Sequence, residues 1–593
     1  MHSNKPQASD HCASKRSSND SSCRENLLEQ IRESVIGERR LIPTSFGDKP
    51  LVYADYTASG RSLSFIEDTL RERVLPFYAN THTETSFTGA QSTAYREQAR
   101  EIIRAAVNGS EEDQIIFCGS GATSAINKLV DILGLRSPSA NQDAPVVFVG
   151  PYEHHSNELP WRESCAEVVT IPLAADGGLD LKALEDALQR YAQRPLKIGS
   201  FSAASNVTGI KTDTLAVAKL LHAHGALSFW DYAAAAPYVA VDMNPKANAD
   251  ALESAQELSK DAVFLSPHKL VGGPGTPGVL IVKKKLMTNA VPAMPGGGTV
   301  LYVTPQDHTF IEDPQRREEG GTPAIVEAIR AGLVFKLQQD VGVDVIENKE
   351  AEFRQRALAC WNDNPNIEVL GNTDKDSLSI FSLRFKCPTA DANRDLHYGF
   401  VVALLNDLFG IQARGGCSCA GPYGHELLGL NMEKSRAIER EIGKGQMILR
   451  PGWVRLNFNY FIDENTFDYL INAVNLIAQE GWRLLPFYAF DASSSTWRYE
   501  GRAMQLGQSL MDLDLGAAVA AAKSVPSSNL AEYFDAAVQE IEAAKARQNP
   551  SSNSVFLPAS VEALRWFVLP QELDPGAESS ASLPLPADEK GAA

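Results

Sequence analysis

Residues 261–282 read DAVFLSPHKLVGGPGTPGVLIV, and this stretch places a single lysine, Lys269, in apolar surroundings. The runs AVFL and GVLIV on either side predict two buried strands, and the glycines and prolines between them predict a loop. Most lysines are solvated surface charges, but a lysine in an apolar pocket has a lowered pKa and becomes a usable nucleophile. Lys269 is therefore a candidate for Schiff-base chemistry with an aldehyde cofactor.

Length, composition and charge limit the classes of function. The chain has 593 residues, 44% of them hydrophobic, which is enough for two or three domains with a sizeable core. A formal net charge of −19 argues against nucleic acid or an anionic membrane as a partner. No apolar run approaches the length of a membrane span.

The cysteines and the first residues bear on the compartment. Residues 1–24 lack the apolar core of a secretory signal, and Asp10 and Asp20 argue mildly against an organelle-targeting segment. Eight cysteines in so long a chain do not make a disulfide framework. We expect a reducing compartment and a cytoplasmic protein, with organelle targeting left open.

The chain divides into segments of different character. Residues 1–24 are expected to form a disordered tail, and from 25 to 490 short apolar strands alternate with amphipathic helices, as in α/β proteins. We expect a large domain at 25–334 and a smaller α/β domain at 335–490. The extension at 491–593 is predicted to be partly helical and partly disordered, because helical stretches there alternate with segments rich in Ser, Pro and Gly.

Polar groups stand directly after several predicted strands of the large domain. In open α/β sheets, ligands bind beyond the carboxyl ends of the strands. The turn CGSGATSAIN opens into a helix, so the backbone at Gly121, Ala122 and Thr123 is a candidate phosphate site. His154 could stack on a pyridine ring, and Asp231 could pair with its protonated nitrogen. Taken singly, each also has a structural explanation: a common glycine turn, a hydrogen-bonded histidine or a capping aspartate.

Four short motifs extend this set: EHHSN at 153–157, SNVTG at 205–209, SPHK at 266–269 and EGGTP at 319–323. From YADYTASG near residue 53 to WVRLNFNYF near 461, the chain resembles the fold-type-I pyridoxal phosphate enzymes of the class V aminotransferase family. The resemblance is to the branch that contains cysteine desulfurases and selenocysteine lyases. It implies pyridoxal 5′-phosphate as cofactor and a large domain with a mainly parallel seven-stranded sheet, followed by a smaller C-terminal α/β domain.

The resemblance also implies roles for the motif residues. Lys269 matches the Schiff-base lysine, and His154 matches the histidine that stacks on the cofactor ring. Thr322 matches a threonine that reaches the phosphate of the neighbouring subunit, so a homodimer is implied. The implied cofactor contacts are Gly121, Ala122, Thr123, His154, Asn206, Asp231, Ser266, His268, Lys269 and Thr322.

Two later stretches bear on the reaction. In GWVRLNFNYF, Arg455 matches the family's arginine for the substrate carboxylate, and a planar guanidinium suits that bidentate contact. The loop GIQARGGCSCAGPYGH places Cys419 on the nucleophile position of desulfurases, with Arg414 close by to lower its pKa. Cys417 stands where a histidine is usual, so either thiol is a candidate. No second Cys or His pair has the spacing of a zinc site, so no metal is expected.

The implied reaction converts L-cysteine to L-alanine and leaves sulfur as a persulfide on the enzyme, from which a sulfur-acceptor protein could take it. Three positions depart from the family pattern: Thr57, Ala122 and Ala234 replace an alanine, a threonine and a glutamine. A selenocysteine lyase, a carbon–sulfur lyase, and an aminotransferase or epimerase remain alternatives. So does a non-catalytic scaffold that binds a partner through the C-terminal extension, where VEALRWFVLP could equally be core.

Overall fold

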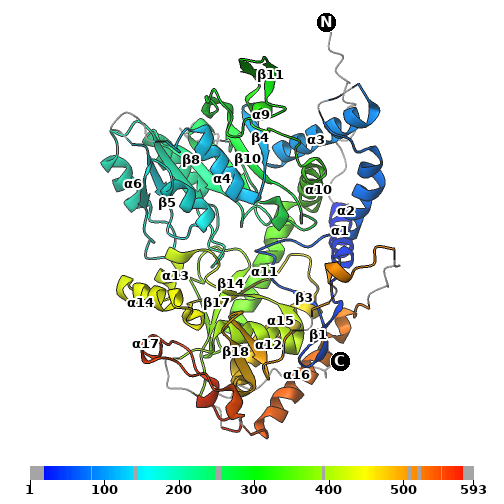
Figure 1. Ribbon diagram of the computed structural model, residues 1–593, viewed down its shortest axis with the longest axis vertical. Coiled ribbons are helices and arrows are strands. Elements are labelled where there is room, and N and C mark those ends of the chain that lie inside the picture. Colours follow the sequence, from blue (N-terminus) through cyan, green and yellow to red (C-terminus); the bar gives the residue numbers. More distant parts are fainter. Residues whose placement is uncertain are drawn as a thin grey trace.

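The computed structural model describes residues 19–577 except 82, 84, 138–143, 247–254, 390–393, 505, 508, 517–522 and 549. The predicted tail is therefore described only from residue 19, where a helix begins, and the end of the predicted extension lies outside the described residues. Figure 1 shows two α/β parts, one above the other along the long axis. Helix α11 (Val343–Trp361) connects them, because Ile346 packs in the core of the first part and Trp361 in that of the second.

The first part is built on a seven-stranded sheet. Six strands run in one direction, and only β10 is antiparallel to both of its neighbours, β4 and β9. The predicted mainly parallel seven-stranded sheet is thus confirmed. Its order is β4 (Asp113–Cys118), β10 (Gly278–Lys283), β9 (Ala262–Leu265), β8 (Leu227–Asp231), β7 (Lys197–Ser202), β5 (Val146–Val149) and β6 (Glu167–Thr170).

Both faces of this sheet are buried, which explains the continuous apolar runs of its strands. In β9, Val263 and Leu265 belong to one core cluster while Ala262 and Phe264 belong to another, because successive side chains point to opposite faces. The helices of this part are α3 (Phe87–Ala106), α4 (Gly121–Ile132), α6 (Leu181–Arg190), α7 (Thr214–Ala223) and α10 (Ile325–Val341).

Local signals fix the ends of several helices. The Asp213 side chain accepts hydrogen bonds from the amides of Leu215 and Ala216 and so caps the start of α7. Gly225 follows the helix with a φ of +66°, a left-handed conformation that glycine adopts without strain. Helix α7, from the stretch TDTLAVAKLLHAHG, therefore has a capping residue at each end.

The second part is built on a four-stranded sheet with its own core. The sheet order is β13 (Ile367–Val369), β14 (Ile380–Phe385), β17 (Trp453–Asn457) and β16 (Arg414–Gly416). The N-terminal segment joins this part, since β3 (Val52–Tyr53) pairs in parallel with β15 (Ile411–Gln412). Its helices are α12 (Tyr398–Phe409), α13 (Gly421–Leu427), α14 (Met432–Gly443) and α15 (Glu464–Glu480).

The C-terminal residues pack on the second part. Phe567 and Val568, from the stretch VEALRWFVLP, are buried in its core together with Leu530 and Ile541. That stretch is therefore a piece of core. The elements of this segment are β18 (Tyr488–Asp491), β19 (Thr496–Tyr499), α16 (Leu530–Lys545) and α17 (Ala559–Glu562).

The remaining elements are short or peripheral to the two sheets. Among the described residues, no helix combines the length and the apolar character that crossing a membrane requires. The elements are α1 (Asn19–Ser34), β1 (Leu41–Thr44), β2 (Gly47–Pro50), α2 (Ser64–Thr69), α5 (Leu159–Arg162), α8 (Ala255–Leu258), β11 (Val300–Val303), β12 (His308–Phe310) and α9 (Pro314–Arg317).

Candidate active site

A cavity of about 220 Å³ lies where the carboxyl ends of β5, β7, β8 and β9 face the second part. Most of the site residues predicted from sequence line it, although they are spread over more than 330 positions of the chain. Those residues are Gly121, Ala122, Thr123, His154, Asn206, Asp231, Ser266, His268, Lys269, Arg414, Cys419 and Arg455. Thr322 and Cys417 do not line it.

Lys269 ends a short 3-10 turn directly after β9. Its amide donates to the carbonyl of Ser266 at 3.0 Å, and the carbonyl of His268 accepts from the amide of Gly60 at 2.8 Å. Burial lowers the pKa of the Lys269 ammonium from 10.5 to about 8, although the nearby Asp231 carboxylate acts in the opposite direction. Roughly a tenth of this amine is therefore neutral, and nucleophilic, at pH 7, far more than for an ordinary lysine.

Asp231 is the last residue of β8, and only 4% of its surface is exposed. Burial raises the pKa of its carboxyl, while the amide of Ala233, at 2.8 Å from Oδ1, and the charge of Lys269 lower it. The acid has no direct arginine or lysine salt bridge among the described residues. It is thus placed to pair with a cationic group of a ligand.

The N-terminus of α4 forms an anion cradle on one side of the cavity. Gly121 has a φ of +58°, and an added Cβ would lie 2.9 Å from both the Ser266 hydroxyl and the His268 ring. The Ser266 hydroxyl accepts from the amide of Ala122 at 2.9 Å, and the Thr123 and Ser156 hydroxyls lie 2.6 Å apart. Amides and hydroxyls at the positive end of a helix favour a bound anion.

His154 lines the cavity as a neutral imidazole. Burial and the positive charge of Lys269 lower its pKa to about 3, and its Nδ1 accepts from the amide of Ser156 at 3.1 Å. Behind it, the buried Glu153 carboxyl is hydrogen-bonded to the Asn157 amide and the Ser202 hydroxyl, both at 2.6 Å. Burial raises the pKa of Glu153 to about 7. Sequence reasoning missed this supporting group, although Glu153 opens the motif EHHSN.

Two arginines from neighbouring strands of the second sheet face the cavity and share one acid. Arg455 Nη2 lies 2.8 Å from Asp55 Oδ1, and Arg414 Nε lies 3.1 Å from Asp55 Oδ2. Arg455 Nη1 also donates to the carbonyl of Asn206 at 3.1 Å. Asp55 was not among the predicted site residues. Its position in YADYTASG could have indicated it, but the pairing of β3 with β15 that places it here is not visible in the sequence.

The loop with two cysteines reaches the cavity in a constrained conformation. Ser418 and Cys419 have φ values of +53° and +56°, which non-glycine residues rarely adopt. The carbonyl of Cys419 accepts from the His155 amide and that of Ser418 from the Asn206 side chain, both at 2.8 Å. Cys419 is exposed, whereas Cys417 is partly buried beside a cluster that includes Trp453. The loop thus presents Cys419, and not Cys417, to the cavity.

Four buried polar atoms of the cavity wall have no hydrogen-bond partner among the described residues. They are Thr57 Oγ1, Asn206 Oδ1, Ser418 Oγ and Arg455 Nε. Buried polar atoms are almost always paired in proteins, so orphaned ones gathered around a cavity indicate a polar ligand.

Comparison with known proteins agrees with this geometry. The sequence model described as Aminotransferase class-V matches residues 52–437, well over half of the chain. The chain belongs to this family. A relative from Halalkalibacterium halodurans named "probable cysteine desulfurase" is 30% identical over 377 residues, which cover 63% of this chain and 85% of the relative. A relative of the same name from Staphylococcus aureus strain Mu50 is 28% identical over 393 residues, 65% and 87% of the two chains.

Solved structures of cysteine desulfurases share the fold of this aminotransferase class-V protein. The enzyme from Thermococcus onnurineus NA1 superposes with a TM-score of 0.58 at 23% identity, and covers 72% of this chain and 94% of its own. CsdA from Escherichia coli gives a TM-score of 0.56 at 22% identity, with 76% and 97% covered. The predicted fold type is therefore confirmed.

The families to which these proteins belong depend on pyridoxal 5′-phosphate, and the cavity fits that group. Its phosphate needs an anion cradle, which the start of α4 with Ser266 and His268 offers. Its pyridine nitrogen needs an acid, and its aldehyde needs an amine. Asp231 and Lys269 line the same cavity. Asn206 offers a further polar contact, because its Oδ1 has no partner among the described residues while its side-chain amide donates to the carbonyl of Ser418.

Thr322 is not brought to this cavity. It is exposed, and its hydroxyl accepts from the Asn80 side chain at 3.3 Å. The role implied for it involves a neighbouring subunit, so that role stays a prediction.

Proposed function

We propose that this aminotransferase class-V protein is a cysteine desulfurase that converts L-cysteine to L-alanine and carries the sulfur as a persulfide on Cys419. The observation that supports this most directly is the position of Cys419. Its exposed side chain lines the same cavity as the buried Lys269 amine and the Arg455 guanidinium. An enzyme that only transfers amino groups needs no thiol there.

The proposed cofactor contacts follow from the cavity wall. The amides that begin α4 with Ser266 and His268 would hold the phosphate, Asp231 the pyridine nitrogen and His154 the ring face. When bound, pyridoxal phosphate supplies an electron sink that labilises bonds at the α carbon of an amino acid. His154 stays uncharged at neutral pH because its pKa is about 3, so it can lie against a ring without adding a positive charge.

The chain's own groups divide the remaining work. Arg455 binds the α carboxylate through its free donors, and the neutral Lys269 amine accepts the α proton. The Cys419 thiolate attacks the substrate sulfur, so that a sulfur–sulfur bond forms and the carbon–sulfur bond breaks. The β carbon then takes a proton, and Lys269 returns one to the α carbon. L-cysteine and the Cys419 thiol thus give L-alanine and the Cys419 persulfide, with every atom retained.

The test is alanine formation from L-cysteine by Cys419→Ala and Cys417→Ala variants in the presence of dithiothreitol. We expect Cys419→Ala to lose at least about 100-fold in turnover, as enzymes do without their nucleophile, and to keep the visible absorption of the bound cofactor. The matched Cys417→Ala variant should keep most activity, because Cys417 does not line the cavity. Undiminished alanine formation by Cys419→Ala would contradict the proposal, because the sulfur would then leave the substrate without attack by this thiol.

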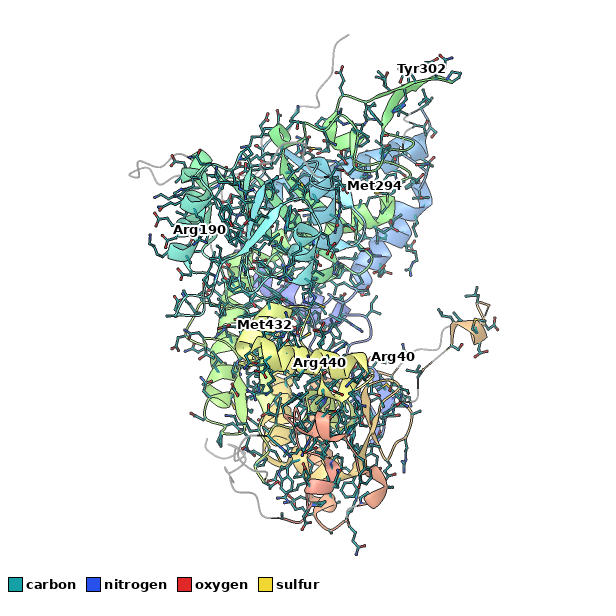
Figure 2. All side chains as sticks on the ribbon, turned by 60° about the vertical axis from the view of Figure 1, so that its left-hand side comes forward. Arg40, Arg190, Met294, Tyr302, Met432 and Arg440 are labelled. Carbon is teal, nitrogen blue, oxygen red and sulfur yellow. The ribbon has the colours of Figure 1, made fainter. Side chains whose placement is uncertain are left out.

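We also propose that the active form is a homodimer. The hairpin of β11 and β12 projects from the first part and exposes apolar side chains to solvent. Figure 2 shows Tyr302 on this hairpin at the top of the molecule, and 70% of its surface is exposed. Exposed apolar side chains that stand next to one another commonly mark protein interfaces. A cytoplasmic site of action and a sulfur-acceptor protein remain expectations from the sequence.

A further inference from the structure

We propose that Asp55 sets the substrate class of this site. By cancelling one of two guanidinium charges, it selects amino acids with a single carboxylate, such as L-cysteine, over amino acids with an acidic side chain, such as L-cysteine sulfinate or L-aspartate. The inference rests on the proposed function, since it assigns Arg455 and Arg414 to substrate binding.

The position of Asp55 is fixed by backbone pairing of Ala54 with β15, which precedes Arg414, and with β17, which carries Arg455. The amide of Ala54 donates to the carbonyl of Gln412 at 3.0 Å, and the carbonyl of Ala54 accepts from the amide of Asn457 at 3.0 Å. Gln412 stands two residues before Arg414, and Asn457 two residues after Arg455. The carboxylate is therefore held between the two guanidinium groups by backbone pairing on either side.

Each oxygen of Asp55 engages one arginine. Oδ1 lies 2.8 Å from Arg455 Nη2, and Oδ2 lies 3.1 Å from Arg414 Nε. The Asp55 side chain is 12% exposed and that of Arg455 4%, so solvent screens this pair weakly. Arg414 is 52% exposed and stands at the open side. Charge-assisted bonds of this kind are strong enough to persist when a substrate enters.

Arg455 keeps donors for only one further carboxylate. Its Nη1 donates to Asn206 and its Nη2 to Asp55, while its buried Nε has no partner among the described residues. The edge formed by Nε and the second hydrogen of Nη2 matches the two oxygens of one carboxylate.

The charges of the groups assigned to the substrate leave an excess of one positive charge. The two arginines and Asp55 sum to +1, while Lys269 and Asp231 are assigned to the cofactor and do not enter this sum. His154 and His268 are neutral at pH 7, since burial lowers their pKa values to about 3 and about 4. One carboxylate neutralises this excess. A second anionic group would remain without a counter-charge in a partly buried site, which is costly.

The test compares two ligands of equal chain length, butanoate and succinate, which have one and two carboxylates and no amine to react with the cofactor. Their binding to the holoenzyme is measured by isothermal titration calorimetry for the wild type and for Asp55→Asn. We expect the ratio of succinate affinity to butanoate affinity to rise at least about tenfold in the variant. In parallel, the ratio of kcat/KM for L-cysteine sulfinate to that for L-cysteine should rise.

Control variants separate charge from shape. Asp55→Glu keeps the charge and should keep the ratio of the wild type, and Asp340→Asn removes a surface carboxylate paired with Lys336 and should change nothing. If Asp55→Asn does not fold, Asp55→Ser replaces it. An affinity ratio within about twofold of the wild type overturns the inference, and so does an equal rise in Asp55→Glu. A wild type that forms no alanine, combined with the shifted ratio, would refute the desulfurase proposal and leave this inference standing.

Discussion

The chemistry of Lys269 depends on a balance between burial and one charge. Burial lowers the pKa of its ammonium, and Asp231 partly offsets that effect from the end of the adjacent strand β8. The same pair works in reverse on Asp231, whose pKa burial raises and Lys269 lowers. An amine poised near neutral pH and a buried acid thus stabilise each other before any ligand binds.

The first prediction concerns the titration of Lys269 in the protein freed of cofactor. With a pKa of about 8 in place of 10.5, its neutral fraction at pH 7 is roughly 300-fold that of an ordinary lysine. Trace acetylation followed by mass spectrometry should therefore show labelling of Lys269 that rises with pH, with a midpoint near 8. Exposed Lys182, whose pKa is raised by hydrogen bonds to Asp186 and Glu185, serves as the internal control, with a midpoint above that of an ordinary lysine.

A second variant gives the sign of the charge effect. Asp231→Asn removes the group that raises the pKa of Lys269, so its labelling midpoint should fall below 8. A midpoint near 10 in the wild type would show that the amine is solvated and would contradict the buried site.

The sequence was sufficient to predict the residues that face the cofactor, but not the buried acids that hold other site residues in position. Lys269, Asp231 and His154 follow strands, and their types match the groups that a cofactor needs, so pattern and chemistry together indicate them. Asp55 and Glu153 lie in quoted motifs, yet the arginines paired with Asp55 are more than 350 residues away, and Ser202, which donates to Glu153, is 49 residues away. Such contacts depend on how the strands pair, which single-sequence periodicity does not reveal.

At the scale of elements, the contact of β10 with the start of α4 shapes the anion cradle. Gly278 begins β10, and its amide donates to the carbonyl of Gly119 at 3.0 Å. A Cβ atom at Gly278 would lie 2.0 Å from the carbonyl oxygen of Gly121, so the close contact between the strand and the turn leaves no room for a side chain. The glycines of GGPGTPG read as loop residues in the sequence. The structure shows that Gly278, the last glycine of this run and the first residue of β10, has a packing role as well.

The second prediction follows from this close approach. In Gly278→Ala, the new methyl group must displace the carbonyl of Gly121, and the cost should be about 1–3 kcal/mol of unfolding free energy, as for other overpacking substitutions. Because the turn before α4 moves, the affinity for pyridoxal phosphate should also fall, measured by titration of its absorption. Gly443→Ala, at the exposed end of α14, where no atom outside the helix's own backbone lies within 4 Å of the added methyl, is the matched control and should lower neither quantity. Equal behaviour of the two variants would contradict the assigned contact.

At the scale of the whole molecule, the active cavity lies between the two parts, and the C-terminal segment stabilises the second of them. The segment is not covered by the family match at 52–437, yet its residues complete a core to which α12 and α15 also contribute. Trp566 stacks on His397 and on Tyr398, with interplanar angles of 21° and 11°. Tyr398 in turn contacts Gly415, the neighbour of Arg414 in β16. Through Trp566 and Tyr398, the C-terminal segment therefore packs against β16, the strand that carries Arg414.

The third prediction tests this support. Phe567→Ala opens a cavity in the second core, where Phe567 is fully buried, and should lower the unfolding free energy by about 3–5 kcal/mol. Trp566→Ala removes the stack on Tyr398 from a partly buried position and should cost less stability. Its main effect should be a raised KM for L-cysteine, because Tyr398, which packs against β16 beside Arg414, is then no longer held by the stacked indole.

Urea denaturation and steady-state kinetics on both variants separate the two effects. Deletion of residues 578–593 leaves every contact described above in place and is the control. If Trp566→Ala lowers stability as much as Phe567→Ala with KM unchanged, the C-terminal segment acts on the fold of the second part and not on the carboxylate site.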